Sequence, residues 1–245
     1  MLELDFKKMY YLFDIDGTIT PARQKMTPDF RNYFLKWMTD KKVIFVTGSD
    51  YLKIQEQVCD EILNKAERVY CCMGNSCWKN GVEIFRNNWA LETELEDFLH
   101  SKIKNSKYPL RLGNHIEKRI GMLNFSIVGR NANKDDRKKY FEWDNANKER
   151  KQIQLELKNK FPKIDCQIGG EISMDIIPFG HDKTQVLNYI DDNVYFFADK
   201  MFNGGNDETL AKALSEKINN KIFPVKIPEE TMKILIELSN NTKLL

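Results

Sequence analysis

Histidine is scarce in this 245-residue sequence, and neither a long apolar run nor an excess of charge of one sign is present. The three histidines, His100, His115 and His181, are scattered and indicate neither a metal site nor a catalytic triad. No stretch has the length needed to span a bilayer, and no apolar segment of signal-peptide length stands at the N-terminus. We therefore expect a cytoplasmic protein that does not enter a membrane.

Charge and cysteine content argue against two further classes of protein. The 38 basic residues nearly balance the 36 acidic ones, so bulk charge predicts no nucleic-acid-binding surface. Five cysteines are an odd set, which argues against a disulfide framework. Cys71, Cys72 and Cys77 cluster, but they lack paired C-x-x-C spacing and a nearby histidine. Buried free thiols are therefore favoured over a zinc site.

The first eighty residues alternate between short apolar runs and amphipathic segments. Strands are expected at 10–13, 43–46 and 69–73. A helix is expected to open at Thr27 and Pro28, with Thr27 as its cap, and Asp50 is expected to cap the next helix. The helix that Asp50 caps is expected to carry Ile54, Val58 and Ile62 on its apolar side. Strands that alternate with helices predict a parallel sheet covered on both faces.

The middle of the chain has a different pattern. Asn80-Gly81 is a hairpin signal, and strands are expected at 122–128, 164–168 and 172–177, with one long helix at 135–160. The alternating pattern returns with an apolar strand at 194–198. The fold class is therefore α/β with a parallel sheet, plus an inserted α+β cap domain with an antiparallel sheet. We expect a catalytic core at 1–83 and 181–245 and a substrate-specificity cap at 84–180.

The segment Asp14-Ile15-Asp16-Gly17-Thr18, directly after the first strand, carries the strongest chemical signal. Ligands of open α/β sheets bind at the carboxyl ends of the strands. Two carboxylates one residue apart point the same way from an extended backbone, which suits one as nucleophile and metal ligand and the other as general acid/base. A calcium loop or Asx turn is the alternative, but Thr20-Pro21-Ala22 supplies no further calcium ligands.

This segment resembles the D-x-D-G-T motif of the haloacid dehalogenase-like (HAD) superfamily, which implies a HAD-like Rossmannoid core. Three further motifs of that superfamily follow in the expected order. Thr47-Gly48-Ser49 comes after the second strand, and Asp182-Lys183-Thr184 opens a late helix. Asp199, with Gly204-Gly205-Asn206-Asp207, follows a hydrophobic strand. Each of the later three is weak alone, since Thr-Gly-Ser is also a simple turn. The ordered set is specific.

The resemblance implies a role for each motif. Asp14 forms an aspartyl phosphate, and Asp16 protonates the leaving oxygen and later deprotonates the incoming hydroxyl. Lys183 and a hydroxyl, from Ser49 or Thr47, hold the transferring oxygens. Magnesium is implied, bound by Asp14, the main-chain carbonyl of Asp16, and Asp199, with Asn206 and Asp207 orienting the metal shell. Helix capping is the other interpretation of Asn206 and Asp207.

Motifs of the middle segment narrow the resemblance to the eukaryotic-type phosphomannomutases. The family motif T-x-x-R-Q stands here as Thr20-Pro21-Ala22-Arg23-Gln24, and R-N-G-M-L-N stands as Arg119-Ile120-Gly121-Met122-Leu123-Asn124. The family's G-R, with a further arginine seven residues on, stands as Gly129-Arg130 and Arg137. The motif G-G-x-I-S-x-D stands as Gly169-Gly170-Glu171-Ile172-Ser173-Met174-Asp175. The similarity runs from about Tyr11 to Asp207.

The family resemblance implies a substrate clamp and a reaction. Four arginines, Arg23, Arg119, Arg130 and Arg137, would bind the phosphate that is not reacting; a surface ion pair is the alternative for any one of them. Ser173 and Asp175 would contact sugar hydroxyls. The implied enzyme interconverts mannose 6-phosphate and mannose 1-phosphate through a hexose 1,6-bisphosphate, which also serves as activator, and feeds GDP-mannose synthesis as a homodimer joined through the cap. The alternative is a HAD-type sugar-phosphate phosphatase.

The sequence departs from the family pattern in four places. Lys118 and Ile120 replace Phe and Asn beside the first clamp arginine, and Met73-Gly74-Asn75-Ser76 stands where the family has E-N-G. The usual T-x-P before Gly204 is absent, and the chain after Asp207 lacks the continuation that carries a second cation site. These departures bear on the preference for mannose or glucose phosphates and on the access of water to the phosphoenzyme.

Overall fold

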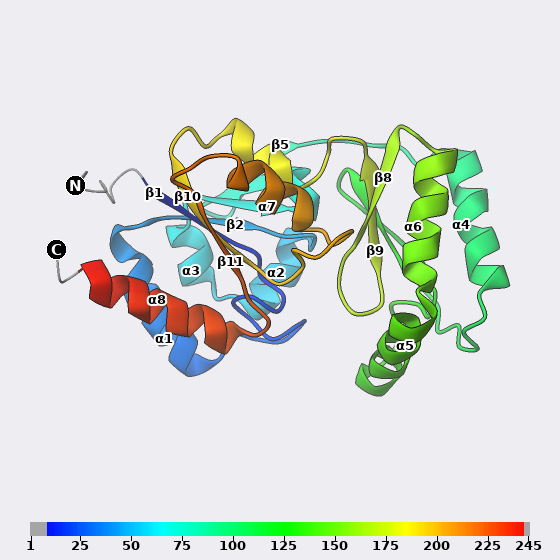
Figure 1. Ribbon diagram of the computed structural model, residues 1–245, viewed down its shortest axis with the longest axis horizontal. Helices are drawn as coiled ribbons and strands as arrows, with labels where there is room; N and C mark the ends of the chain where they lie inside the picture. The colour runs from blue at the N-terminus through cyan, green and yellow to red at the C-terminus, as the bar shows by residue number, and fades with distance from the viewer. Residues whose placement is uncertain (1–8, 243–245) are drawn as a thin grey trace.

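Two β-sheets organise the computed structural model, which describes residues 9–242 (Figure 1). The larger sheet has seven strands in the order β11-β10-β1-β2-β3-β4-β5. Its members are β1 (Met9–Phe13), β2 (Lys42–Val46), β3 (Arg68–Cys71), β4 (Ser76–Lys79), β5 (Val82–Arg86), β10 (Asn193–Ala198) and β11 (Lys221–Pro224). Pairing is parallel from β11 to β3, and β3, β4 and β5 pair antiparallel.

Helices cover both faces of this sheet. The cluster that includes Phe13, Phe34 and Leu235 packs on one face, under α1 (Pro28–Trp37), α2 (Tyr51–Gln57), α3 (Asp60–Lys65) and α8 (Pro228–Thr242). The opposite face, with Leu12 and Leu210, packs under the short 3₁₀ helix η4 (Lys183–Asn188) and α7 (Glu208–Ser215). The two-sided burial explains why β1, β2 and β10 are continuous apolar runs. The predicted α/β layer is confirmed.

The second sheet is antiparallel and belongs to the segment between β5 and η4. Its order is β6-β7-β9-β8, formed by β6 (Ile116–Arg119), β7 (Met122–Phe125), β9 (Met174–Pro178) and β8 (Ile164–Ile168). One face packs on α4 (Thr93–Asn105), α5 (Lys134–Asn147) and α6 (Glu149–Lys160), which lie on the side away from the larger sheet (Figure 1). This is the inserted antiparallel α+β domain that the sequence pattern predicts.

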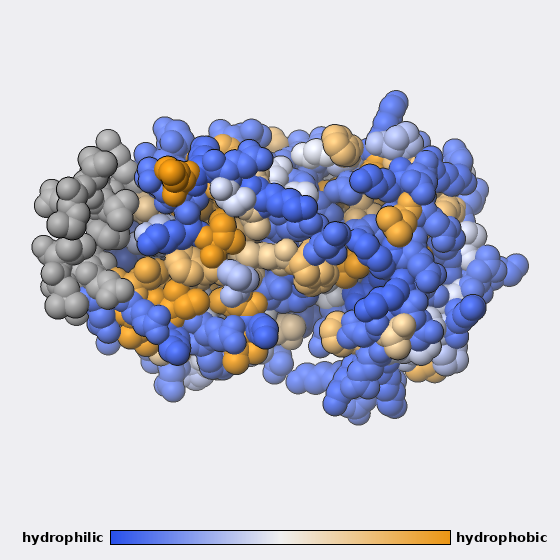
Figure 2. Space-filling model, viewed as in Figure 1, coloured by the Kyte–Doolittle hydropathy of each residue, from blue (hydrophilic) through white to orange (hydrophobic). Residues whose placement is uncertain are grey.

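The surface of the molecule differs between the two domains on the face that Figure 2 shows. Hydrophilic side chains predominate over the helices of the inserted domain, whereas hydrophobic residues gather around α8 on the side of the larger sheet (Figure 2). Exposed apolar side chains at the start and within α8 include Ile227 and Ile236.

Domain limits stay a prediction, and two observations bear on them. Strand β5 carries the larger sheet as far as Arg86, so the predicted limit at 83 falls inside a strand. Residues 1–8 and 243–245 of the predicted core lie outside the described part of the chain. None of the helices within residues 9–242 combines the length and the apolar character that crossing a membrane requires.

Two predicted helices are each interrupted. The segment expected to be one helix at 135–160 breaks at Lys148, whose φ of 58° is left-handed, so α5 and α6 are separate helices. The helix capped by Asp50 ends at Gln57, and Ile62 belongs to α3. Neither break is marked by glycine or proline, the residues that most often signal one. Asp50 does cap as predicted, because its side chain accepts a hydrogen bond from Lys53 N at 2.8 Å.

Other local predictions are partly wrong. Thr27 occupies the N-cap position of α1, but its side chain makes no capping hydrogen bond. Strand β3 ends at Cys71, before the predicted Met73, because the 3₁₀ turn η3 (Cys72–Gly74) follows at once. Strand β7 stops at Phe125, and β9 begins at Met174. The hairpin at Asn80-Gly81 forms as expected, joining β4 to β5.

The two sheets meet along the carboxyl ends of β1, β2 and β10. Ile168 at the end of β8 donates its N–H to the carbonyl of Gly204 over 2.7 Å, in the loop that follows β10. A second connection runs from Arg119 Nη1 to the carbonyl of Gly48, also at 2.7 Å, in the loop after β2. The inserted domain therefore lies directly over the edge where parallel α/β sheets bind ligands.

Candidate active site

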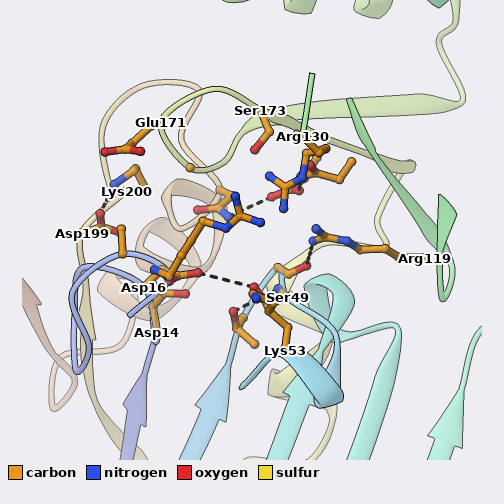
Figure 3. Close-up of a pocket in the computed structure, with 18 of the residues that line it drawn as sticks. Asp14, Asp16, Ser49, Lys53, Arg119, Arg130, Glu171, Ser173, Asp199 and Lys200 are labelled. Carbon is orange, nitrogen blue, oxygen red and sulfur yellow. Dashed lines mark hydrogen bonds and ion pairs between the residues drawn. The ribbon is translucent and has the colours of Figure 1, made fainter. Parts of the chain in front are cut away.

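One pocket lies between the strand ends and the inserted sheet, and it contains most of the predicted site residues (Figure 3). Those that line it are Asp14, Asp16, Arg23, Thr47, Ser49, Arg119, Arg130, Arg137, Ser173, Asp175, Asp199 and Asn206. Lys183 and Asp207 do not line it, because both are fully buried beneath Asp14. Residues from five separate parts of the sequence thus meet in one place.

The carboxylate of Asp14 stands at the end of β1 and is joined to a buried charge network. Lys183 Nζ donates to Asp14 Oδ1 at 2.6 Å and to Asp207 Oδ1 at 2.6 Å. Burial, together with the negative charge of Asp207, raises the pKa of Asp14 to about 7, despite the opposing effect of the Lys183 ammonium. Burial alone lowers the pKa of Lys183, but the two carboxylates outweigh it and raise that pKa. Asp14 is the predicted nucleophile, and its surroundings suit a group that gains and loses negative charge.

Three carboxylates at this point fit a divalent cation. Oxygens of Asp14, Asp199 and Asp207 lie within 4.8 Å of one another. Asp199 Oδ1 is buried and has no hydrogen-bond partner among the described residues. Hard cations prefer such oxygen ligands. Gly17 lies so close that a Cβ there would come within 2.5 Å of Asp199 Oδ2, so this glycine keeps room for the carboxylate.

The cluster differs in detail from the predicted metal set. Asp207 belongs to it directly, although the sequence assigned Asp207 to the metal shell only. The carboxylate of Asp16 is not a member, and a contribution from its main-chain carbonyl stays a prediction. Asp207 holds the N-cap position of α7 without a capping hydrogen bond, since its oxygens bind Lys183 and the N–H of Lys200. The helix-capping interpretation of Asp207 is therefore wrong.

Asp16 is held in a fixed orientation by the backbone and by a glutamine. Its Oδ1 accepts from the main-chain N–H of Arg23 at 2.6 Å and from Gln57 Nε2 at 2.7 Å. Its Oδ2 accepts from Ser49 Oγ at 3.5 Å, so this oxygen faces the pocket. Arg23 has a left-handed φ of 57°, which presents its N–H to the carboxylate. Thr47 Oγ1 accepts from the N–H of Ser49 at 3.2 Å, and both hydroxyls remain candidates for phosphoryl binding.

Opposite these acids, three arginines of the inserted domain are each held along the Nε edge by a glutamate. Arg119 and Arg130 share Glu117, at 2.6 Å and 3.1 Å. Arg137 binds Glu171 at 3.1 Å. The arginine side chains are only 7–10% exposed, and Arg137 Nη1 is buried with no partner among the described residues. A buried guanidinium N–H without a partner is costly, and the Arg137 side chain lines the pocket.

Positive charge exceeds negative charge at this end of the pocket. Burial lowers the pKa of Arg137, and the nearby Arg130 lowers it further. Burial likewise lowers the pKa of Arg130, and the charges of Arg23 and Arg119 add to the effect. Burial alone raises the pKa of Glu117, but Arg119 and Arg130 outweigh it and lower that pKa. The arrangement suits a doubly charged anion such as a phosphate, which guanidinium groups bind through paired N–H donors.

Ser173 and Asp175 line the pocket from the inserted domain, at the start of β9. Asp175 Oδ1 accepts from Asn124 Nδ2 at 2.8 Å, and Oδ2 accepts from Asn206 Nδ2 at 3.1 Å. Burial raises the pKa of Asp175. The carboxylate thus joins the inserted sheet to the loop after β10, as well as lining the pocket.

Several pocket or positioning residues escaped prediction from the sequence, namely Lys53, Gln57, Glu117, Asn124, Glu171 and Lys200. Gln57 stands three residues after the buried Ile54 and is therefore a polar residue on the apolar face of its helix. This position was the sequence signal that could have marked Gln57 as a hydrogen-bonding residue. The ammonium of Lys200 contacts Asp199 Oδ2.

The cysteines take no part in this site. Cys71, Cys72 and Cys77 are buried free thiols, as predicted. Burial raises the pKa of Cys72 to about 12, so this thiol stays protonated at neutral pH.

Comparison with known proteins decides the family. The family model for eukaryotic phosphomannomutase matches residues 30–241. The chain belongs to this family. A phosphomannomutase of Spinacia oleracea is 34% identical over 237 residues, which cover 93% of this chain and 94% of that protein. Phosphomannomutase of Saccharomyces cerevisiae is 33% identical over 241 residues, covering 94% of this chain and 93% of the relative.

Solved structures resemble this phosphomannomutase-family chain in fold. A haloacid dehalogenase-like hydrolase from Bacteroides thetaiotaomicron has a TM-score of 0.57 at 12% identity, covering 94% of this chain and 99% of that one. The C-terminal domain of trehalose-6-phosphate phosphatase from C. albicans has a TM-score of 0.60 at 14% identity, with coverage of 96% and 93%. At such identities the likeness shows a HAD-like fold and nothing about substrate, and the predicted fold class is confirmed.

Proposed function

We propose that this protein is a magnesium-dependent phosphomannomutase that interconverts mannose 6-phosphate and mannose 1-phosphate. The single observation that carries the proposal is the pairing of two anion-binding ends in one pocket. Asp14 and its acidic neighbours form one end, and the arginines held by Glu117 and Glu171 form the other. A sugar with a phosphate at each end fits this arrangement better than a monophosphate does. The family membership supports the same reaction.

In the first half of the reaction, phosphorylated Asp14 transfers its phosphoryl group to a hydroxyl of the bound sugar monophosphate. Asp16 removes the hydroxyl proton, the sugar oxygen bonds to phosphorus, and the bond from phosphorus to Asp14 breaks. Lys183, already 2.6 Å from Asp14, stabilises the carboxylate that is released. The product is a hexose 1,6-bisphosphate.

The second half reverses the roles of the two phosphates. After the bisphosphate turns, Asp14 attacks the other phosphorus, and Asp16 returns its proton to the leaving sugar oxygen. Four arginines hold the phosphate that is not reacting in each half, namely Arg23, Arg119, Arg130 and Arg137. Asp14, Asp199 and Asp207 would hold Mg²⁺, which offsets the negative charge on the transferring oxygens when bound. A catalytic amount of hexose 1,6-bisphosphate is the proposed activator, because it phosphorylates Asp14.

The same proposal extends to the sugar and to the setting of the enzyme. Ser173 and Asp175 contact sugar hydroxyls from the cap side of the pocket. The protein works in the cytoplasm, feeds GDP-mannose synthesis and acts as a homodimer joined through the cap. Its substrate is a sugar phosphate, with no role for nucleic acid or membrane.

A sugar-phosphate phosphatase is the second candidate function. It has the same nucleophile, but water takes the phosphoryl group from Asp14. The contacts that seal the cap over the strand ends, from Arg119 to Gly48 and from Ile168 to Gly204, favour the mutase because they restrict water.

The deciding experiment supplies purified protein with mannose 1-phosphate, Mg²⁺ and a trace of glucose 1,6-bisphosphate, and follows mannose 6-phosphate and free phosphate together. The mutase predicts isomer forming at least about tenfold faster than phosphate, with both lost in Asp14→Asn. Phosphate release without isomer establishes the phosphatase instead. Glucose 1-phosphate, tested in parallel, shows whether the enzyme prefers mannose or glucose.

A further inference from the structure

Asn75 occupies a buried position where the larger sheet, the inserted domain and both connections between them meet. It follows η3, in which Cys72, Met73 and Gly74 all have positive φ angles, of 51°, 63° and 91°. Asn75 itself is 0% exposed. Its Nδ2 donates to the carbonyl of Cys72 at 2.8 Å, which fixes the side chain against its own turn. This is the segment in which the sequence departs from the family's E-N-G.

The outgoing connection to the inserted domain is bound to Asn75 twice. Asn87, the first residue after β5, donates its main-chain N–H to the carbonyl of Asn75 at 2.7 Å. Its side-chain Nδ2 donates to Asn75 Oδ1 at 3.1 Å. The start of this connection is therefore anchored to one core residue.

The returning connection reaches the same residue. Asn75 Nδ2 donates to the carbonyl of His181 at 3.1 Å, two residues before the catalytic Lys183. Gln185 Nε2, two residues after Lys183, donates to Asn75 Oδ1 at 3.4 Å. Asn87 Nδ2 also donates to Gln185 Oε1 at 2.8 Å, so the two connections bind each other as well as Asn75.

The turn between β6 and β7 packs on Asn75 from the cap side. A Cβ placed on Gly121, which has a φ of 63°, would lie 2.7 Å from Asn75 Cβ, so backbone and side chain are in close contact. Gly121 stands two residues after Arg119. One buried side chain thus contacts the segments that carry Lys183 beneath the nucleophile and Arg119 of the phosphate clamp.

We propose that Asn75 is a positioning residue that sets the arginine clamp relative to Asp14 by tying both interdomain connections to the core. We call the hydrogen bonds of Asn75 to the two interdomain connections the tie. The catalytic consequence rests on the proposed function, whereas the tie itself does not. With the tie in place, the cap stays closed over phosphorylated Asp14. Without it, the cap opens more often and a water oxygen attacks phosphorus. The bond to Asp14 then breaks, phosphate is released, and Asp16 takes the water's proton.

The test compares Asn75→Leu, which keeps the side-chain volume and removes every hydrogen bond of the amide, with a matched control. Asn220→Leu is the control, because Asn220 also uses both amide atoms, bonding the N–H of Val194 and the carbonyl of Leu214, at the opposite edge of the sheet. Amide hydrogen exchange is followed in residues 86–90 and 179–185. We expect about tenfold faster exchange in both segments for Asn75→Leu and no change there for the control.

Catalysis supplies the second readout. We expect Asn75→Leu to raise the ratio of phosphate released to isomer formed by about tenfold, while the Asn220→Leu control leaves this ratio within about twofold of the wild-type value. If Asn75→Leu does not fold, Asn87→Ala removes the side-chain bonds on the partly exposed connection and should show smaller changes of the same sign. Exchange in both connections that matches the Asn220→Leu control would overturn the tie. Faster exchange with an unchanged product ratio would overturn its role in positioning, and a wild-type protein that forms no isomer would count against the proposed function alone.

Discussion

The ammonium group of Lys183 lies 2.6 Å from a carboxylate oxygen of Asp14 and forms the same contact with Asp207, entirely out of reach of solvent. The lysine comes from the segment that returns from the inserted domain, whereas Asp14 directly follows the first strand. A buried cation between two carboxylates holds these segments together and balances the negative charge of Asp14 and Asp207.

Removing that cation should affect both folding and catalysis. Lys183→Met leaves two buried carboxylates without their partner, and breaking a buried pair in this way costs about 3–5 kcal/mol. We expect the free energy of unfolding in urea to fall by that amount and isomerisation to fall by at least about a thousandfold. The exposed Lys212→Met serves as control. A variant with wild-type stability would show that Lys183 does not balance the charge of these carboxylates.

The raised pKa of Asp14 predicts how the metal-free protein responds to pH. A carboxyl whose pKa is about 7 when folded, above its unfolded value, stabilises the fold fully below the unfolded pKa. That stabilisation is lost as pH rises through about 7. In EDTA, the Tm of the wild type should therefore decline between pH 6 and 8 relative to Asp14→Asn, which cannot ionise. A constant difference in Tm over this range would show that Asp14 is not perturbed.

Magnesium should bind with release of a proton for the same reason. The cation requires ionised Asp14, so its apparent affinity should rise with pH up to about 7 and level off above. Calorimetry in two buffers of different ionisation enthalpy measures the proton count directly. We expect proton release near pH 6 and none at pH 8.5. Equal proton counts at both values would place the metal away from Asp14.

Arg137, whose Nη1 has no hydrogen-bond partner among the described residues, should contribute to substrate binding more than to the chemical step. A hydrogen bond to a charged group contributes about 1.5–3 kcal/mol, so Arg137→Met should raise KM for sugar phosphate by roughly 10- to 100-fold. Hydrolysis of p-nitrophenyl phosphate, which has no second phosphate, should stay within about twofold. Arg86→Met, on an exposed strand, is the matched control. Equal losses on both substrates would mean that Arg137 does not bind the distal phosphate.

Gln57 should affect the proton transfers that Asp16 carries out. Gln57→Leu removes the 2.7 Å hydrogen bond to Asp16 Oδ1 and allows the carboxyl to turn. General acid/base catalysis contributes about 10²–10⁴-fold, so a loss of about 10- to 100-fold in isomerisation is expected. The p-nitrophenolate leaving group needs little protonation, and its release should change far less. Gln55→Leu, on the exposed side of the same helix, controls for the loss of a glutamine, and a similar loss there would contradict the role of Gln57.

Local sequence patterns predicted most of the elements, and the family motifs named most of the residues that line the pocket, because both kinds of signal are short. Asp14 and Asp16 follow an apolar strand, and Asp50 caps a helix through a contact three residues away. The break at Lys148 was not predictable in this way, since a left-handed lysine carries no marker in the sequence. The hydrogen bonds of Glu117 to Arg130 and of Gln57 to Asp16 join residues 13 and 41 positions apart, so only the fold reveals them.

Phosphoryl transfer through Asp14 is the central claim, and trapping the phosphoenzyme tests it most directly. Protein is mixed with radiolabelled glucose 1,6-bisphosphate, a portion is quenched and digested, and the labelled peptide is identified by mass spectrometry. The remainder receives unlabelled mannose 6-phosphate. We predict label on the peptide that contains Asp14, which then passes to the sugar and forms a bisphosphate. Label on another residue, or label that passes only to water, would contradict the account.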